Sequence, residues 1–310
     1  MGSTLKTRYR IAEQMTKRIL VTGATGAQGG ALIPLLLEKG FSVRALTRDP
    51  EKASARRLAQ LGVEVVAGDL DDEDSLDRAC EACDGVFSVQ NFWEKGVGHE
   101  REVEQGCKLA RAAKQAGVSH FVQTSVANCD EAAGVLHFES KYKIEQYIDS
   151  LALPRTFIRE VFFMENFTQP VMTSGAKKSM SPFWVLPTII GLLDQNTRFH
   201  MISVEDIAWF AADVFAHPQE FIGKELDVAG DVLTAGEMKA VYHKVTGRRL
   251  PPVSRFLMRL MLRFVNPESA RQFNWNNQQG WKFDIAPLQQ RHAGLVNFER
   301  FLRNYYELGG

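Results

Sequence analysis

The chain has 310 residues, of which 45% are hydrophobic, so it can bury a sizeable core as one large or two unequal domains. Its 37 Lys and Arg residues balance 37 Asp and Glu residues, and a neutral chain has no overall field that attracts nucleic acid or an anionic membrane. No apolar run approaches the roughly 20 residues of a membrane-spanning helix, and no export signal is recognisable. We therefore expect a cytoplasmic protein that binds neither nucleic acid directly nor a membrane.

Residues 1–16 are polar and more basic than acidic. A basic, acid-poor start also occurs in transit peptides, but Met15 lies directly before the first predicted strand and could be an alternative start. We interpret residues 1–16 as a disordered N-terminal extension.

From residue 18 on, short apolar runs alternate with longer segments of helical period, as in repeated strand–helix–strand units of a parallel sheet. The runs predict strands at 18–22, 42–47, 63–67, 85–89, 120–124 and 156–159. The expected fold class is α/β, with a doubly wound, Rossmann-like parallel sheet over residues 17–160, to which residues 200–230 return. A smaller, mainly helical domain would comprise residues 161–199 and 231–310.

The glycine-rich stretch from Gly23 to Gly30 follows the first predicted strand and opens a helix predicted over 31–39. At such a position glycine lets the chain turn, and the helix offers free N–H groups and its positive end to a pyrophosphate. The Gly-x-x-Gly-x-x-Gly spacing differs from the usual Gly-x-Gly-x-x-Gly fingerprint. We expect a dinucleotide site here, against the alternative of a glycine-rich turn that binds nothing. Pro34 should distort the helix locally.

The second strand leads into Arg48 and Asp49, about twenty residues past the glycines, where a dinucleotide fold meets the adenosine ribose. A guanidinium suits the 2′-phosphate of NADP, whereas a carboxylate suits the 2′-hydroxyl of NAD. Arg48 therefore favours NADP(H), while Asp49 leaves NAD(H) open and both residues could form a solvated turn. Asp69 and Leu70, after the third strand, are expected at the adenine edge.

The fourth and fifth strands lead into Gln90 and Asn91 and into Thr124 and Ser125. In an open α/β sheet, ligands bind beyond the carboxyl ends of the strands. We therefore expect these four side chains to line the nicotinamide half of a bound dinucleotide.

His137 and Lys141 lie one turn apart in a helix predicted to run through Asp149. Short-chain dehydrogenases place a catalytic tyrosine and its lysine at this spacing, and the lysine holds the nicotinamide ribose. Histidine stands at the tyrosine position here, and Tyr142 points off that face. His137, Lys141 and Ser125 are the catalytic candidates, against the alternatives that His137 only packs and that Lys141 is solvated.

On these motifs the chain resembles the NmrA-like family, atypical short-chain dehydrogenase relatives that include NADP-binding transcriptional regulators and a redox sensor. The resemblance rests on residues 21–30, 47–50, 137–141, 162–167 and 202–208, and it covers about residues 17–247. It implies NADP(H) binding. The positions that it adds as cofactor contacts are Thr22, Gly23, Thr25, Gly26, Ala27, Gln28, Gly29, Glu160, Phe163 and Asn166.

The resemblance allows two functions. Family members that lack the tyrosine are often regarded as sensors of the NADP(H) ratio, which favours a redox-sensing regulator that acts on a protein partner. The alternative is an NADPH-dependent reductase of a small carbonyl, quinone or imine, with His137 as its acid. A homodimer is left open.

The four cysteines, two of which form Cys80-x-x-Cys83, are too few for a disulfide framework. We favour packing over a zinc site or a thiol switch and expect no metal. A polar loop at 175–182 could cover the site, and Phe162, Phe163, Met164 and Trp184 would form either a substrate wall or core.

Further along the chain, Thr234 and Glu237 predict a capped helix start. Arginines four apart leave residues 255–264 with a broad apolar face, for which domain packing is favoured over a partner groove or a membrane-surface helix. Residues 274–279 are predicted as a polar loop, and residues 298–308 as a helix.

Overall fold

The computed structural model describes residues 16–132, 134–168 and 182–307. Its centre is a seven-stranded parallel sheet in the order β3-β2-β1-β4-β5-β6-β9. The strands are β1 (Arg18–Val21), β2 (Ser42–Thr47), β3 (Glu64–Ala67), β4 (Gly85–Ser88), β5 (His120–Val126), β6 (Arg155–Glu160) and β9 (Glu225–Val228). The α/β fold class is thereby confirmed.

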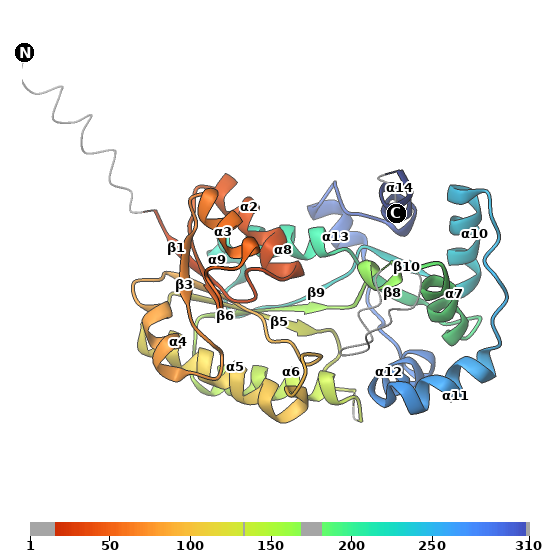
Figure 1. Ribbon diagram of the computed structural model, residues 1–310, viewed down its shortest axis with the longest axis horizontal. Coiled ribbons are helices and arrows are strands. Elements are labelled where there is room, and N and C mark those ends of the chain that lie inside the picture. The colour runs from red at the N-terminus through yellow and green to blue at the C-terminus, as the bar shows by residue number, and fades with distance from the viewer. Residues whose placement is uncertain (1–15, 133, 169–181, 308–310) are drawn as a thin grey trace, which may run out of the picture.

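Helices cover both faces of this sheet (Figure 1). On one face lie α2 (Ala27–Glu38), α3 (Ala53–Gln60), α8 (Val204–Ala216) and the short α9 (Pro218–Phe221). On the other lie α4 (Glu73–Cys80), α5 (Gly98–Gln115) and α6 (Leu136–Ser150). The central strands β1 and β4 are buried along almost their whole length between these layers, as a doubly covered parallel sheet requires, whereas the edge strands β3 and β9 are only partly buried.

The remaining elements form a second part beside the carboxyl ends of the strands (Figure 1). A three-stranded sheet, β10-β8-β7, comprises β7 (Phe162–Phe163), β8 (Phe199–Ile202) and β10 (Asp231–Leu233). Around it lie η1 (Met164–Phe167), α7 (Pro182–Leu192), α10 (Ala235–Thr246), α11 (Arg255–Val265), α12 (Pro267–Gln278), α13 (Ala286–Arg291) and α14 (Phe298–Glu307). The core is continuous across both parts.

Most predicted elements are present, with shifted bounds. The helix α2 begins four residues earlier than predicted and continues past Pro34 to Glu38. The helix that the sequence predicts over 73–83 ends at Cys80, so Cys83 lies outside α4. The predicted capping box is confirmed, because the Thr234 hydroxyl accepts from the Glu237 N–H and the Glu237 carboxylate accepts from the Thr234 N–H.

The prediction of a polar loop at 274–279 is wrong, because these residues continue α12 to Gln278. Asn266 caps this helix by accepting from the Ser269 N–H at 3.0 Å, and Pro267 occupies its first turn. Trp275 is 6% exposed, and its burial stabilises the helical conformation of a segment that is otherwise rich in Asn and Gln.

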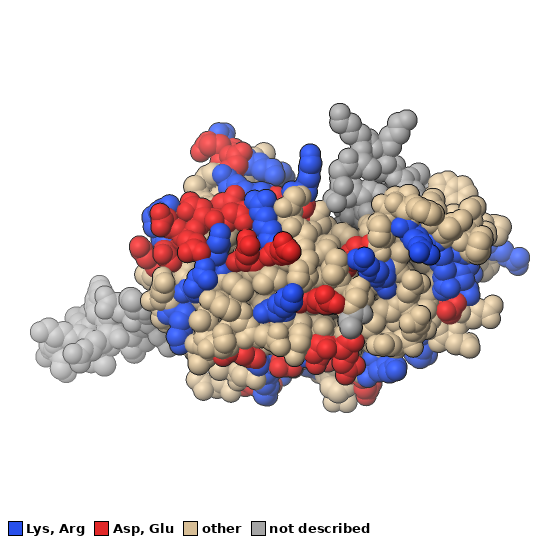
Figure 2. All heavy atoms as spheres, turned by 90° about the horizontal axis from the view of Figure 1, so that it is seen from below, with Lys and Arg blue, Asp and Glu red and all other residues tan. Residues whose placement is uncertain are grey.

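The helix α11 packs against α7 and α12 with only part of its surface. Phe256 and Phe264 are each 78% exposed, and their apolar neighbours Leu257, Leu260 and Val265 are exposed as well. The expectation that domain packing covers this face is therefore wrong for most of it. Figure 2 views the side on which α11 lies and shows Lys and Arg side chains beside uncharged surface over the C-terminal part. Among the described helices, none has the length and apolarity needed to cross a bilayer.

Candidate functional site

A cavity of about 810 Å³ opens at the carboxyl ends of the parallel strands and reaches α12. Every residue singled out from the sequence as a cofactor or catalytic candidate lines it, from Thr22 in β1's extension to Asn166 in η1. A volume of this size is typical of small-molecule and cofactor sites. The structure thus brings the predicted residues together, and their individual roles remain predictions.

The glycine loop forms one end of the cavity and is shaped by close backbone approaches. Gly23 has φ +59°, a conformation that favours glycine, and its carbonyl accepts from the Gly26 N–H at 2.8 Å. A Cβ on Gly29 would lie 2.5 Å from the Gly23 oxygen, so only glycine fits there. No side chain caps α2 at Gly26. The first-turn N–H groups of this helix are therefore available to an anion.

Arg48 lies at the same end and is largely exposed. Its guanidinium contacts Glu94 at 2.5 Å, and this hydrogen bond raises the pKa of Arg48. The Asp49 carboxylate accepts from the Glu51 N–H at 3.0 Å and so serves the local turn. Lys52, which the sequence analysis did not single out, lines the cavity beside them. Two cations thus face the region where a ribose phosphate is expected.

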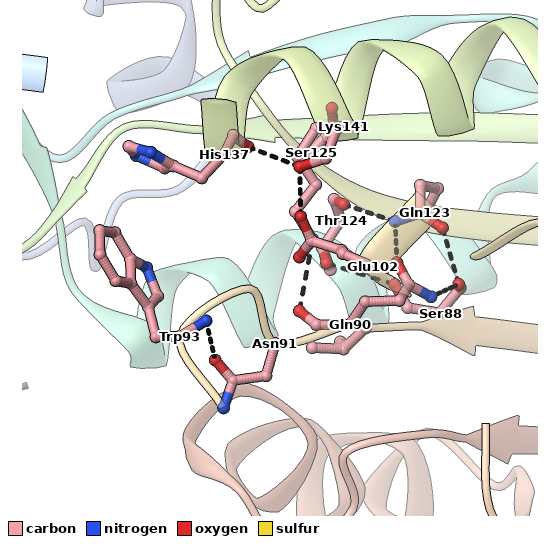
Figure 3. A network of polar contacts seen from close by, with 12 residues as sticks. Ser88, Gln90, Asn91, Trp93, Glu102, Gln123, Thr124, Ser125, His137 and Lys141 are labelled. Atoms are coloured by element: carbon pink, nitrogen blue, oxygen red, sulfur yellow. Dashed lines mark hydrogen bonds and ion pairs between the residues drawn. The ribbon is translucent and has the colours of Figure 1, made fainter. Parts of the chain in front are cut away.

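The floor of the cavity is fixed by a closed ring of hydrogen bonds among buried side chains (Figure 3). Ser88 donates to Gln123 Oε1 at 2.6 Å, Gln123 Nε2 donates to Gln90 Oε1 at 2.9 Å, and Gln90 Nε2 donates back to the Ser88 hydroxyl at 2.8 Å. This ring ties the ends of β4 and β5 together. The Gln90 side chain is therefore held by its neighbours in the fold.

Lys141 reaches into this floor from α6 (Figure 3). Its amine lies 2.9 Å from Glu102 Oε1 and donates to the Gln90 carbonyl at 3.3 Å. The Glu102 side chain, on α5, is fully buried, and the Ser140 hydroxyl donates to its other oxygen. Lys141 compensates the buried charge of Glu102, so its first role is to stabilise the fold, and any contact with a ligand comes in addition.

His137 points away from Lys141 toward Trp93, although the two lie one turn apart (Figure 3). Its Nδ1 lies 2.6 Å from Glu268 Oε1, which also accepts from the His137 backbone N–H at 3.0 Å. Burial would raise the pKa of Glu268, but the hydrogen bonds from His137 and Arg271 hold it below its usual value. The carboxylate therefore places the ring hydrogen on Nδ1.

Two further candidates are almost wholly buried. Ser125 is 1% exposed, and its hydroxyl lies 3.8 Å from the Cys129 sulfur. Glu160 ends β6 and accepts from Gln28 Nε2 at 2.9 Å through one oxygen, while no described residue bonds to the other. Burial raises the pKa of Glu160 to about 8.

Several lining residues were missed by the sequence analysis: Trp93 and Glu94, Glu102 and Gln105, Ser269 and Gln272 of α12, and Trp281. Ser269 is fully buried, and its hydroxyl has no hydrogen-bond partner among the described residues. No local motif marks these positions, because tertiary packing alone brings them to the cavity.

The aromatic stretch after Glu160 divides between the two roles considered for it. Phe162 and Phe163 line the cavity, whereas Met164 is buried in the core. Trp184 is 46% exposed and does not line it. Of the loop predicted at 175–182, residues 175–181 lie outside the described residues.

The cysteines do not have the setting of reactive thiols. Cys80, Cys83 and Cys129 are buried, and burial raises the pKa of Cys80 and of Cys129 to about 12. A thiol with so high a pKa is a poor nucleophile near neutrality, which argues against a thiol switch at these positions. Within the described ranges, no cluster of three or more His, Cys, Asp or Glu side chains is placed to hold a metal ion.

A doubly wound sheet whose glycine loop opens into a cavity at the strand ends is the architecture of dinucleotide-binding proteins. The chain belongs to the NmrA-like family, whose sequence pattern matches residues 15–255. It is 37% identical over 284 residues to a (4-alkanoyl-5-oxo-2,5-dihydrofuran-3-yl)methyl phosphate reductase of Streptomyces griseus, which covers 89% of this chain and 93% of that protein.

Solved structures share the fold at lower identity. The negative transcriptional regulator NmrA in complex with NADP has a TM-score of 0.71 and 19% identity, covering 95% of this chain and 97% of that one. The NADPH-dependent quinone oxidoreductase QOR2 of Escherichia coli, complexed with NADPH, has a TM-score of 0.74 and 20% identity, covering 93% and 99%.

Proposed function

We propose that the protein is an NADP(H)-dependent reductase of a small carbonyl, quinone or imine substrate. The extent of the cavity supports this proposal. The cavity continues beyond the predicted dinucleotide residues to walls supplied by the loop after β4 and by the C-terminal part. Those walls combine aromatic and uncharged polar side chains: Phe92, Trp93, Phe162, Ser269, Gln272 and Trp281. A site for the dinucleotide alone would not need them. The Streptomyces relative is named a reductase, which supports the same conclusion.

The residues present fit the dinucleotide. The uncapped start of α2 and the close approach at Gly29 leave backbone N–H groups free for the pyrophosphate. Arg48 and Lys52 would hold the 2′-phosphate, since a guanidinium and an ammonium both suit that group. Lys141 would offer remaining donors to the ribose of the nicotinamide half.

Bound NADPH supplies a hydride, and reduction of a carbonyl also consumes a proton. His137 is the side chain that we assign to give this proton. Glu268 holds its Nδ1–H and fixes the ring, which leaves Nε2, for which the described residues supply no partner. When the ring is protonated, Nε2 can donate to a substrate oxygen lodged among Trp93 and the other aromatic walls.

One specific observation favours the alternative, a dinucleotide-binding regulator. The tyrosine position holds His137, and both His137 and Lys141 are already engaged by the buried carboxylates Glu268 and Glu102. Such a site would bind the dinucleotide without turnover and act through a protein partner.

The test is to mix pure protein with NADPH and a panel of quinones, aldehydes, imines and unsaturated lactones while following the cofactor absorbance. Steady oxidation with at least one substrate supports the reductase. Tight binding of NADP(H) without turnover on the whole panel defeats it in favour of the regulator, and absence of binding defeats both.

Two variants sharpen the assignment of His137. His137→Gln should lower kcat about 100-fold or more, because positioned proton transfer contributes that much, while NADPH affinity stays within about twofold. Tyr142→Phe is the matched control, because Tyr142 packs against the core and does not line the cavity. Equal activity in both variants would remove His137 from the mechanism.

A further inference from the structure

Glu160 is a buried acid that the proposed mechanism does not use. It is 5% exposed, lines the cavity at the end of β6, and has a neutral amide, Gln28, as its hydrogen-bond partner. Its second oxygen has no partner among the described residues. A carboxyl in such a place is more stable uncharged, since one hydrogen bond from a neutral amide replaces only part of its lost hydration.

The charged groups nearby do not neutralise Glu160. Lys141 of α6 lowers its pKa, but burial outweighs this effect, and the Lys141 amine pairs with Glu102 of α5 instead. Other polar groups that line the cavity at the strand ends are neutral amides and hydroxyls, namely Gln28, Gln90, Thr124 and Ser125. The His137 ring is already paired with Glu268. When Glu160 is ionised, its carboxylate therefore has no cation of its own to pair with.

The proposed dinucleotide would reach Glu160 with its nicotinamide half. A dinucleotide with its pyrophosphate on the glycine loop and its adenosine ribose at Arg48 extends its other half over the ends of β4, β5 and β6. Glu160 ends β6, and Gln28 of the glycine loop bonds to it directly. The nicotinamide ring is a cation in NADP⁺ and is neutral in NADPH, so the two forms differ in charge on this side.

We propose that Glu160 makes the choice between the oxidised and the reduced dinucleotide depend on pH: its carboxylate favours NADP⁺, and its neutral acid favours NADPH. The inference rests on the proposed dinucleotide binding but needs no turnover. The protons balance as follows: NADP⁺ binding releases the carboxyl proton of Glu160 to solvent, and NADPH binding leaves this proton in place. No other bond changes.

Linkage fixes the sign of the effect. Raising the pH removes the Glu160 proton, so NADP⁺ binds more tightly and NADPH less tightly. The ratio of the dissociation constants, NADPH over NADP⁺, should therefore rise between about pH 6.5 and 9, by about tenfold or more in total. The 2′-phosphate is common to both forms, so its own titration cancels in the ratio.

The experiment measures both dissociation constants against pH for the wild-type chain, for Glu160→Gln and for Glu165→Gln. Glu160→Gln cannot titrate and should give a flat ratio. Glu165 is the matched control, because it is a partly buried acid with a raised pKa that does not line the cavity. Its variant should follow the wild type. A flat wild-type ratio, or the same slope in Glu160→Gln, overturns the proposal.

A second measurement needs no variant. Calorimetric titration near pH 7 in buffers of different ionisation heats counts the protons released on binding. We expect clearly more release with NADP⁺ than with NADPH, and equal release contradicts the proposal. Failure of dinucleotide binding looks different, since neither dinucleotide would then bind at all, whereas absence of turnover alone would leave both measurements unchanged.

Discussion

The two ends of the cavity use charge in different ways. At the glycine-loop end the backbone sets the shape, and the charged side chains Arg48 and Glu94 are 64% and 37% exposed. At the far end the charges are buried, with Glu102 at 0% and Lys141 at 11%. Exposed pairs contribute little to stability, whereas breaking a buried pair is costly. We infer that the Arg48–Glu94 pair acts mainly on the choice of ligand, and that the Lys141–Glu102 pair mainly stabilises the fold.

The largest effect is expected from breaking the buried pair. Lys141→Met leaves the Glu102 carboxylate buried without its counter-charge, and should lower the free energy of unfolding by about 3–5 kcal/mol. Urea unfolding without cofactor measures this. Lys143→Met is the control, because Lys143 is exposed on the same helix, and it should change stability by less than about 0.5 kcal/mol.

Adding Glu102→Gln to Lys141→Met should restore much of the loss, since the uncompensated charge is then gone. If Lys141→Met proved as mild as Lys143→Met, the far end would not depend on buried charge, and the contrast between the two ends would fail.

The next effect concerns the backbone at the glycine loop. Gly29→Ala would place a Cβ 2.5 Å from the Gly23 oxygen and 2.8 Å from its carbon, so the loop must move. We expect a loss of about 1–3 kcal/mol in stability and at least tenfold weaker dinucleotide binding, measured by thermal unfolding and fluorescence titration.

Gly30→Ala is the matched control, since its Cβ would meet only the Ala24 oxygen, at 3.7 Å. It should fold and bind like the wild type, or gain slightly in stability because alanine favours a helix. Normal binding by Gly29→Ala would show that close approach of the loop does not shape the site.

The strands and the glycine loop show what the sequence can predict. All six predicted strands are present within two residues at each end, because each is a short run with a mainly apolar middle that pairs in the sheet. Glycines at fixed spacing after such a strand specify a local backbone path. Residues close in sequence determine both features, so the first end of the cavity could be predicted from the chain.

The far end depends on contacts that no local pattern encodes. Glu268 meets His137 across 131 positions, and the helix that carries it was predicted to turn into a polar loop. Asn and Gln at 274–279 favour loops by composition, yet capping at Asn266 and burial of Trp275 override that preference. Likewise, the exposed apolar face of α11 cannot be read from its pattern, because amphipathic spacing does not tell which side a partner covers.

A smaller effect tests ligand selection by the exposed charges. Arg48→Ala should lower the preference for NADP(H) over NAD(H) about tenfold or more, which corresponds to about 1.4 kcal/mol, while stability changes by less than about 1 kcal/mol. Competitive titration with both dinucleotides measures the preference. Arg56→Ala is the control, because Arg56 is similarly exposed and pairs with Glu51 without lining the cavity. An unchanged preference in Arg48→Ala would assign cofactor choice elsewhere.

The smallest effect separates Arg48 from its present partner. Glu94→Gln removes the carboxylate that holds the guanidinium at 2.5 Å, so Arg48 no longer exchanges an ion pair for the 2′-phosphate. Because an exposed pair contributes about 0.2–1 kcal/mol, NADP(H) should bind up to about fivefold more tightly, with NAD(H) affinity unchanged. Titration of both dinucleotides decides the matter. If NAD(H) binding weakened instead, Glu94 itself would contact the ribose hydroxyls. The glycine-loop end of the cavity would then select its ligand through the Glu94 carboxylate as well as the Arg48 guanidinium.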